Sequence, residues 1–169
     1  NIYFYYHNVE KGLEYYERAA KLNNSNALIN LGNMYCNGNN NVKQDYSKAF
    51  DYYKKAAYCH NDISYIALGN MYFYGNGVIK DYSKARYYYK LAAKCNNIDG
   101  FNIIGFMYEC GKGCKKDYSK AIKFYEKAAS QNHQNALNNL GNIYLNGIGT
   151  VKNIEKAKYL FEKSSNIGN

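Results

Sequence analysis

Apolar positions recur along this chain with the period of an α-helix, in segments of about a dozen residues. The first complete segment, residues 26–37, has apolar residues spaced as on one helix face: Ala27, Leu31, Met34 and Tyr35. A second segment opens at Asp45 and carries a stripe of the same kind, Ala49, Tyr53, Ala56 and Ala57. Gly38 lies between the segments, where a helix commonly ends because glycine takes the left-handed conformation without a Cβ clash. The pattern predicts two helices joined by a short loop.

This helix pair returns along the chain. A Leu-Gly or Ile-Gly step occurs four times, with glycines 37, 36 and 36 residues apart at Gly32, Gly69, Gly105 and Gly141. A tyrosine lies three residues after each of these glycines, at Tyr35, Tyr72, Tyr108 and Tyr144. Each second helix is predicted to begin after an N-cap residue, at Asp45, Asp81, Asp117 or Asn153. We predict one array over residues 1–169, with a half unit at 1–24 and repeats at 25–61, 62–97, 98–133 and 134–169.

A single helix hairpin cannot bury its own apolar face, so it must stack on its neighbours. The expected fold is an all-α solenoid of antiparallel helix hairpins, with the first helices lining a concave face and the second helices a convex face. Small residues such as Gly32 and Ala49 are expected to let two helix backbones approach closely, and the recurring tyrosines to fill the space between neighbouring hairpins.

The residues from Ser64 to Ala85 give the repeat its clearest form, Ala-x-x-x-Leu-Gly-x-x-Tyr-x-x-Gly-x-Gly-Val-x-x-Asp-Tyr-x-Lys-Ala, with Ser64 at the first position. This pattern resembles the Sel-1-like repeat, a relative of the tetratricopeptide repeat. The chain lacks the proline often found before the Asp, and Cys114 and Thr150 replace the loop valine. The resemblance covers the whole chain and implies a right-handed superhelix. It also implies the role of an adaptor that assembles protein complexes.

Composition narrows the class further. With 17% aromatic residues, the chain has too many large side chains for a disordered segment, and no apolar run is long enough to cross a membrane. The net charge is +9, and the lysines of the chain fall mostly on the predicted second helices. Because only Arg18 and Arg86 are arginines and no exposed aromatics alternate with the lysines, a solvated face is favoured over a nucleic-acid site. An acidic protein partner stays open as an alternative.

The beginning of the chain and its thiols add two expectations. The chain starts at Asn1 without a methionine or a leader, which indicates a piece of a longer protein. The apolar run Ile2 to Tyr6 falls where the end of a preceding first helix and its loop are expected, and its exposure predicts self-association. Five irregularly spaced cysteines favour a reducing intracellular compartment, the cytoplasm, with the lumen of the endoplasmic reticulum as the alternative.

Catalytic and metal-binding patterns are missing from the sequence. There is no His-Glu-x-x-His, phosphate-binding glycine loop or Gly-x-Ser-x-Gly motif. His60 and His133 are placed at the ends of second helices, and Cys110 and Cys114 lack a second pair with metal spacing. We therefore expect no enzyme activity, no cofactor and no metal.

The candidate binding residues lie on the predicted first helices. Asparagine amides both donate and accept hydrogen bonds, so a series of them suits the backbone of an extended peptide, and aromatic anchors dominate many interfaces. The candidates are Asn30, Asn33, Asn70, Phe73, Tyr74, Phe106, Glu109, Asn139, Asn142 and Asn146. Because the chain has 26 asparagines, composition alone is the favoured explanation of the series, and the aromatics can equally be buried against the adjacent repeat. We expect a protein-interaction adaptor that binds a partner segment in the concave groove; the alternative is a structural spacer within a larger protein.

Overall fold

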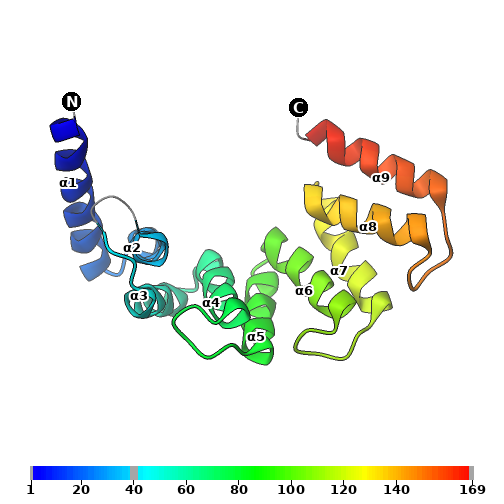
Figure 1. Ribbon diagram of the computed structural model, residues 1–169, viewed down its shortest axis with the longest axis horizontal. Helices are drawn as coiled ribbons and strands as arrows, with labels where there is room; N and C mark the ends of the chain where they lie inside the picture. Colours follow the sequence, from blue (N-terminus) through cyan, green and yellow to red (C-terminus); the bar gives the residue numbers. More distant parts are fainter. Residues whose placement is uncertain (1, 39–41, 168–169) are drawn as a thin grey trace. The chain divides into compact units, whose positions relative to one another are not determined.

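The structure, a computed structural model, describes residues 2–38 and 42–167, with side chains from residue 11 onward. Over these residues the chain is all-α, as predicted (Figure 1). Its helices are α1 (Ile2–Lys21), α2 (Ser25–Asn37), α3 (Tyr46–Tyr58), α4 (Asp62–Tyr74), α5 (Tyr82–Lys94), α6 (Ile98–Cys110), α7 (Tyr118–Ser130), α8 (Gln134–Asn146) and α9 (Ile154–Ile167). The even helices α2 to α8 are the predicted first helices, and the odd ones are the second helices.

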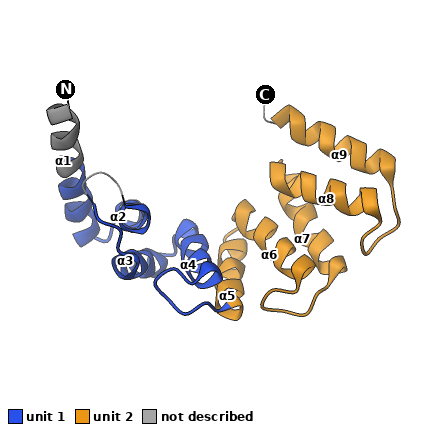
Figure 2. Ribbon diagram, in the orientation of Figure 1, with its two compact units in different colours: residues 1–81 blue, residues 82–169 orange. Residues whose placement is uncertain are grey.

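The helices form two compact units, residues 1–81 and 82–169 (Figure 2). In the first unit, α1 packs on α2, α2 on α3, and α3 on α4. In the second unit each helix from α5 to α9 packs on the next one, and the α6–α7 and α8–α9 hairpins have the most extensive contacts. Each unit therefore has the neighbour-on-neighbour packing of a helical repeat solenoid.

The helix boundaries follow from capping residues. The predicted caps Asp45, Asp117 and Asn153 each accept a hydrogen bond from the backbone N–H three residues later, at 2.9–3.0 Å. The first helices have caps that the sequence analysis did not find, at Asn24, Asn61, Asn97 and His133. The residue before each of these caps has a left-handed backbone, with φ between 55° and 61° at Asn23, His60, Asn96 and Asn132.

His133 was therefore misplaced by the sequence analysis. It does not end a second helix but begins the next first helix: its Nδ1 accepts from the Ala136 N–H at 3.1 Å. Its Nε2 lies 2.9 Å from the Asp99 Oδ1 on α6. His60 does lie just beyond α3, in the left-handed position that reverses the chain.

Three of the repeat glycines, Gly32, Gly105 and Gly141, lie against an aromatic ring. A Cβ on Gly105 would lie 2.7 Å from the Tyr125 ring, and a Cβ on Gly141 would lie 2.5 Å from the Phe161 ring. Gly32 faces the Tyr53 ring in the same way. Because each ring belongs to the second helix of the same repeat, it fills the interior of one hairpin. The tyrosines that recur after the Leu-Gly step are a different set, and two of them do contact the preceding hairpin: Tyr72 meets the Phe50 ring on α3 edge-to-face, and the Tyr108 hydroxyl accepts from Arg86 on α5.

The predicted core is otherwise largely confirmed. Ala27, Leu31, Ala49, Tyr53 and Ala56 are buried. Met34, Tyr35 and Ala57 are only half-buried, because they lie at the edge of their helix faces.

The N-terminal expectation needs a correction. Helix α1 runs without a break from Ile2 to Lys21, so residues 2–6 are not the end of one helix followed by a loop. Residues 2–11 contain no glycine or proline that would end a helix in this stretch. The side chains of Ile2 to Tyr6 lie outside the described residues, and self-association through them stays a prediction. None of the described helices is both long enough and apolar enough to cross a membrane.

Candidate functional site

Two first helices of the second unit, α6 and α8, line an open pocket. It has a volume of about 330 Å³ and lies between α6 and α8. Its lining residues are Asn102, Ile103, Phe106, Asn135, Asn138 and Asn139. Two predicted site residues, Phe106 and Asn139, thus meet here, and four amides surround an apolar patch made of Ile103 and Phe106. We call this the amide pocket.

Hydrogen bonding and exposure give the amide pocket its character. The Asn139 Nδ2 donates to the Asn102 Oδ1 at 3.2 Å, which ties α8 to α6. Phe106 is 36% exposed, and the Lys112 Nζ lies 5.3 Å from the centre of its ring. No lining residue carries a charge. The pocket can therefore offer amide donors and acceptors beside an apolar surface.

The two candidates on α2, Asn30 and Asn33, are partly buried or hydrogen-bonded within the fold. Asn33 is exposed, but its Oδ1 accepts from the Tyr53 hydroxyl at 2.8 Å, while Asn30 is half-buried. Burial of the Tyr53 hydroxyl, followed by the nearby Cys36 thiol, raises the pKa of Tyr53 well above its ordinary value. Asn33 thus satisfies a buried donor, which is a structural role that the sequence analysis did not anticipate.

The α4 candidates lie at the C-terminal part of that helix. Phe73 is half-buried and contacts Tyr74 edge-to-face, with ring centres 5.0 Å apart. Tyr74 is 65% exposed, and Asn70 is exposed. The prediction of an accessible aromatic therefore fits Tyr74 better than Phe73.

The remaining candidates lie away from the amide pocket. Glu109 accepts from the Tyr125 hydroxyl at 2.6 Å, so it pairs with the hairpin interior. Asn142 and Asn146 are exposed, and the Asn146 Nδ2 donates to the Asn142 backbone oxygen at 2.9 Å near the end of α8. The structure does not bring Glu109, Asn142 or Asn146 into the lining.

The sequence analysis missed three of the pocket asparagines. Asn102 and Asn138 are 36 residues, one repeat, apart. Asn138 directly precedes the candidate Asn139. Asn135 lies one helical turn before Asn138 and Asn139. The one-repeat spacing of Asn102 and Asn138 was a signal that the sequence offered. Only the structure shows that Asn102 on α6 meets Asn139 on α8.

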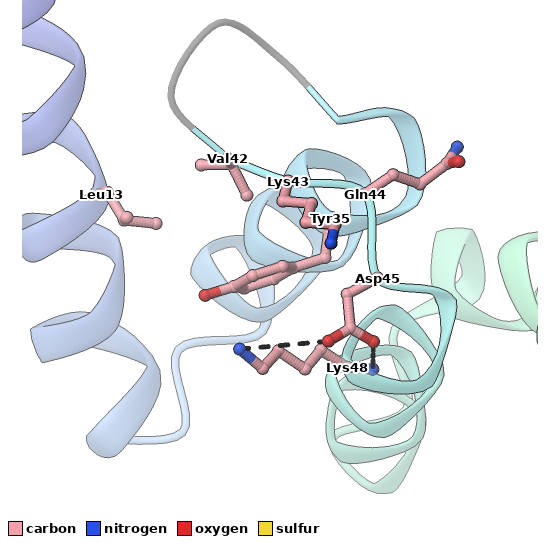
Figure 3. A pocket seen from close by; sticks show the side chains of 7 residues that line it. All are labelled: Leu13, Tyr35, Val42, Lys43, Gln44, Asp45 and Lys48. Atoms are coloured by element: carbon pink, nitrogen blue, oxygen red, sulfur yellow. Dashed lines mark hydrogen bonds and ion pairs between the residues drawn. The ribbon is translucent and has the colours of Figure 1, made fainter.

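A second cavity lies in the first unit, among residues of α1, α2, α3 and the segment before α3. It has a volume of about 450 Å³ and is lined by Leu13, Tyr35, Val42, Lys43, Gln44, Asp45 and Lys48 (Figure 3). The Lys48 Nζ lies 4.0 Å from the Asp45 Oδ2 and 5.0 Å from the centre of the Tyr35 ring. None of the predicted binding residues lines this cavity.

The comparisons with known proteins place the chain in a family. A family model for the Sel1 repeat matches residues 5–24, 25–61, 63–97, 102–133 and 134–169. The chain belongs to the Sel1 repeat family. This result confirms the resemblance that the repeated residues indicated. Sel1 repeat proteins generally serve as scaffolds for protein interactions.

Solved structures agree with this assignment. A Sel1 repeat protein from Oxalobacter formigenes is 31% identical, with a TM-score of 0.87 over 94% of this chain. The protein c5321, a protective antigen of uropathogenic Escherichia coli with the same fold, is 32% identical, with a TM-score of 0.85 over 93% of the chain. The cysteine-rich protein B of Helicobacter pylori is 31% identical; the match has a TM-score of 0.60 and covers 76% of this chain and 92% of that protein.

The chain matches only part of the length of the first two proteins. The chain spans 64% of the length of the Oxalobacter protein and 33% of the length of c5321. A search of curated protein sequences gives no match.

The cysteines of this Sel1 repeat protein are free thiols. All five lie within the described residues, and none forms a disulfide. Burial, followed by the neighbouring Glu109 carboxylate, raises the pKa of the Cys110 thiol, which leaves less reactive thiolate near neutral pH. In the described part of the chain, no three His, Cys, Asp or Glu side chains lie close enough together to hold a metal ion.

Proposed function

We propose that this Sel1 repeat chain is an adaptor that binds an extended, largely uncharged segment of a protein partner on its first helices. The observation that supports it most is the amide pocket between α6 and α8, where four asparagines surround Ile103 and Phe106. The coarser role, a scaffold for protein interactions, is that of the family as a whole.

The chemistry of the pocket suits a peptide backbone. An extended residue presents one N–H and one C=O, and an asparagine amide can satisfy both, since it donates and accepts. Because Asn102 and Asn139 already share one hydrogen bond, they are held in place before a partner arrives. Such preorganisation lowers the entropic cost of binding.

The size and polarity of the pocket suggest how a segment would be anchored. A volume of about 330 Å³ accommodates one large side chain, and Ile103 and Phe106 provide the apolar contact for it. Truncation of an aromatic anchor commonly removes a large part of the binding energy. We therefore expect an extended segment with one apolar side chain seated beside Phe106.

A peptide library displayed on phage tests the proposal. Peptides enriched on the wild-type chain are measured against a pocket variant, Phe106→Ala with Asn138→Ala. The control variant, Tyr159→Ala with Asn166→Ala, removes one aromatic ring and one asparagine amide from exposed positions of α9. Wild-type and control affinities should be similar, and the pocket variant should bind at least about tenfold more weakly.

Two results would count against the proposal. Equal affinity of enriched peptides for the pocket variant and the wild type would place binding elsewhere. Failure to enrich any peptide would favour the alternative role of a spacer within a larger protein. Because the pocket is uncharged, binding should also change little between low and high salt.

A further inference from the structure

We propose that a second surface of this chain, a basic cluster on the α6–α7 loop, binds an acidic segment of a protein partner. The basic cluster consists of Arg86, Lys112, Lys115, Lys116 and Lys120. It adjoins the amide pocket at one residue, since the Lys112 Nζ lies 5.3 Å from the centre of the Phe106 ring, and nothing in the family assignment provides it.

The charge is concentrated in one repeat. The loop of residues 111–116 has three lysines, whereas the corresponding loops 75–80 and 147–152 have one each. Arg86 on α5 is one of two arginines in the chain, and it points at this repeat. The basic cluster is therefore a local feature and not a consequence of the overall charge of +9.

Two carboxylates near the basic cluster already have partners within the chain. Asp117 pairs with Lys120, with the Nζ and Oδ2 2.7 Å apart, and Glu109 accepts from Tyr125. Arg86 forms no ion pair with a carboxylate of the described residues. Its Nε is buried without a hydrogen-bond partner, so the guanidinium loses water without full compensation.

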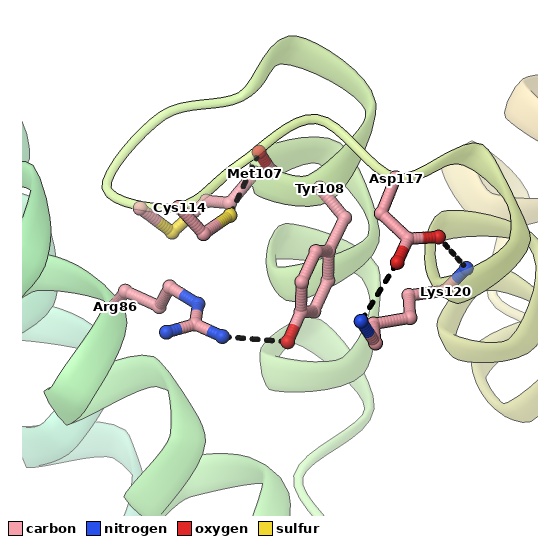
Figure 4. Close-up of polar contacts among 6 residues, drawn as sticks. All are labelled: Arg86, Met107, Tyr108, Cys114, Asp117 and Lys120. Carbon is pink, nitrogen blue, oxygen red and sulfur yellow. Dashed lines mark hydrogen bonds and ion pairs between the residues drawn. The ribbon is translucent and has the colours of Figure 1, made fainter.

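Aromatic rings hold several of the cations in place. The Tyr108 ring lies between Arg86, whose Cζ is 4.9 Å from the ring centre, and Lys120, whose Nζ is 5.6 Å from it. Figure 4 shows Arg86 and Lys120 near the hydroxyl end of Tyr108, to which the Arg86 Nη2 donates at 2.5 Å. The Lys112 Nζ lies 5.6 Å from the Tyr82 ring centre, and the Lys116 Nζ lies 5.4 Å from that of Tyr118.

The loop that carries the lysines is fixed as well. Gly111 and Gly113 have φ values of 70° and 66°, which glycine adopts without strain. A Cβ on Gly113 would collide with the Tyr82 carbonyl oxygen, so the loop lies directly against the start of α5. The Cys114 Sγ donates to the Met107 oxygen at 3.5 Å (Figure 4). Cations held by rings and a fixed loop lose little freedom when an anion binds.

The ring contacts favour a protein segment over a nucleic acid. Single-stranded nucleic acids bind by stacking bases on open aromatic faces. Tyr82, Tyr108 and Tyr118 each already carry a cation on a face. A flexible chain of carboxylates needs only the cations, which matches the chemistry of the basic cluster.

The test uses a labelled oligoglutamate peptide and two variants of equal charge. Lys112→Gln, Lys115→Gln and Lys116→Gln change the basic cluster, whereas Lys43→Gln, Lys152→Gln and Lys158→Gln change exposed lysines elsewhere. Each triple variant lowers the net charge from +9 by three, to +6. Circular dichroism melts of both variants establish that they remain folded.

We expect low-salt binding of the peptide to weaken about tenfold in the cluster variant, as for three ion pairs of modest strength, and about twofold or less in the control. Equal weakening in both variants would overturn the proposal, because only net charge would then matter. Absence of peptide binding to the wild type at low salt would overturn it too. Tighter binding of an oligouridylate or of phosphatidylserine vesicles than of the peptide would replace the acidic segment with a nucleic acid or a membrane.

Discussion

At the scale of single residues, a glycine fits against an aromatic ring inside three of the hairpins. Gly105 lies under the Tyr125 ring, and Gly32 and Gly141 lie under Tyr53 and Phe161. Tyr125 is fully buried, and its hydroxyl donates to the Glu109 Oε2. The glycine therefore provides space for a ring, and the Tyr125 ring carries its hydroxyl to Glu109 on the opposite helix.

Gly105→Ala should destabilise the chain, because the new methyl group would lie 2.7 Å from the Tyr125 ring. Overpacking of this kind costs about 1–3 kcal/mol. Gly12→Ala is the matched control: nothing lies within 4 Å of its Cβ, and alanine in a helix should stabilise by about 0.5–1 kcal/mol. Urea denaturation measures both, and equal effects of the two substitutions would contradict the packing argument.

Tyr125→Phe should show a stability difference from wild type that depends on pH. Burial, and then the hydrogen bond to Glu109, raises the pKa of Tyr125 in the folded state. An unfolded tyrosine ionises near pH ~10, so the contribution of the protonated hydroxyl is complete below that pH and is lost as the pH rises above it. Each further pH unit lowers the wild-type free energy of unfolding by up to about 1.4 kcal/mol relative to the variant.

Urea midpoints of wild type and Tyr125→Phe at about pH 8 and about pH 11 test this expectation. The wild type should be more stable at the lower pH, and its advantage should shrink at the higher one. A difference that stays constant would mean that the hydroxyl ionises equally in the folded and unfolded states.

At the scale of helices, capping residues decide where each element begins. Asn24, Asn61 and Asn97 cap α2, α4 and α6, and His133 takes the same place before α8. The imidazole accepts through Nδ1, so its Nε2 carries the proton toward Asp99. One first helix is thus capped by an imidazole, whereas the other three are capped by an asparagine amide.

His133→Ala should destabilise by about 1 kcal/mol, since it leaves the Ala136 N–H without its acceptor. His133→Asn should be close to wild type, because asparagine caps the other first helices. The contact with Asp99, which is 67% exposed, should add little. Thermal melts of the two variants separate these effects, and an equal loss in both would show that the Asp99 contact matters more than the cap.

The helices were largely predictable from the sequence, because apolar spacing and capping are local properties. The segment 26–37 and the caps Asp45, Asp117 and Asn153 needed no knowledge of neighbours. His133 was misplaced because the sequence alone does not show on which side of the chain reversal it lies. The partner of Gly105 was also missed, since the ring comes from the following helix, 20 residues later.

At the scale of the whole molecule, the repeat presents the same positions again and again, and a few departures from it create distinct surfaces. In the second unit, asparagines at 102, 135, 138 and 139 form the amide pocket, and lysines at 112 and 115 form part of the basic cluster. The repeat predicted which helices carry candidates such as Phe106 and Asn139. It could not predict which of them share a pocket, because that depends on packing between helices.

Photo-cross-linking tests the central claim, binding on the first helices, most directly. A benzoylphenylalanine replaces Phe106 in the amide pocket or, in a control chain, Tyr159, which is 61% exposed on α9. Irradiation with a peptide enriched on the wild-type chain should give a cross-linked product from position 106 and little from position 159. Cross-linking from 159 alone would contradict the account and place the partner on the second helices.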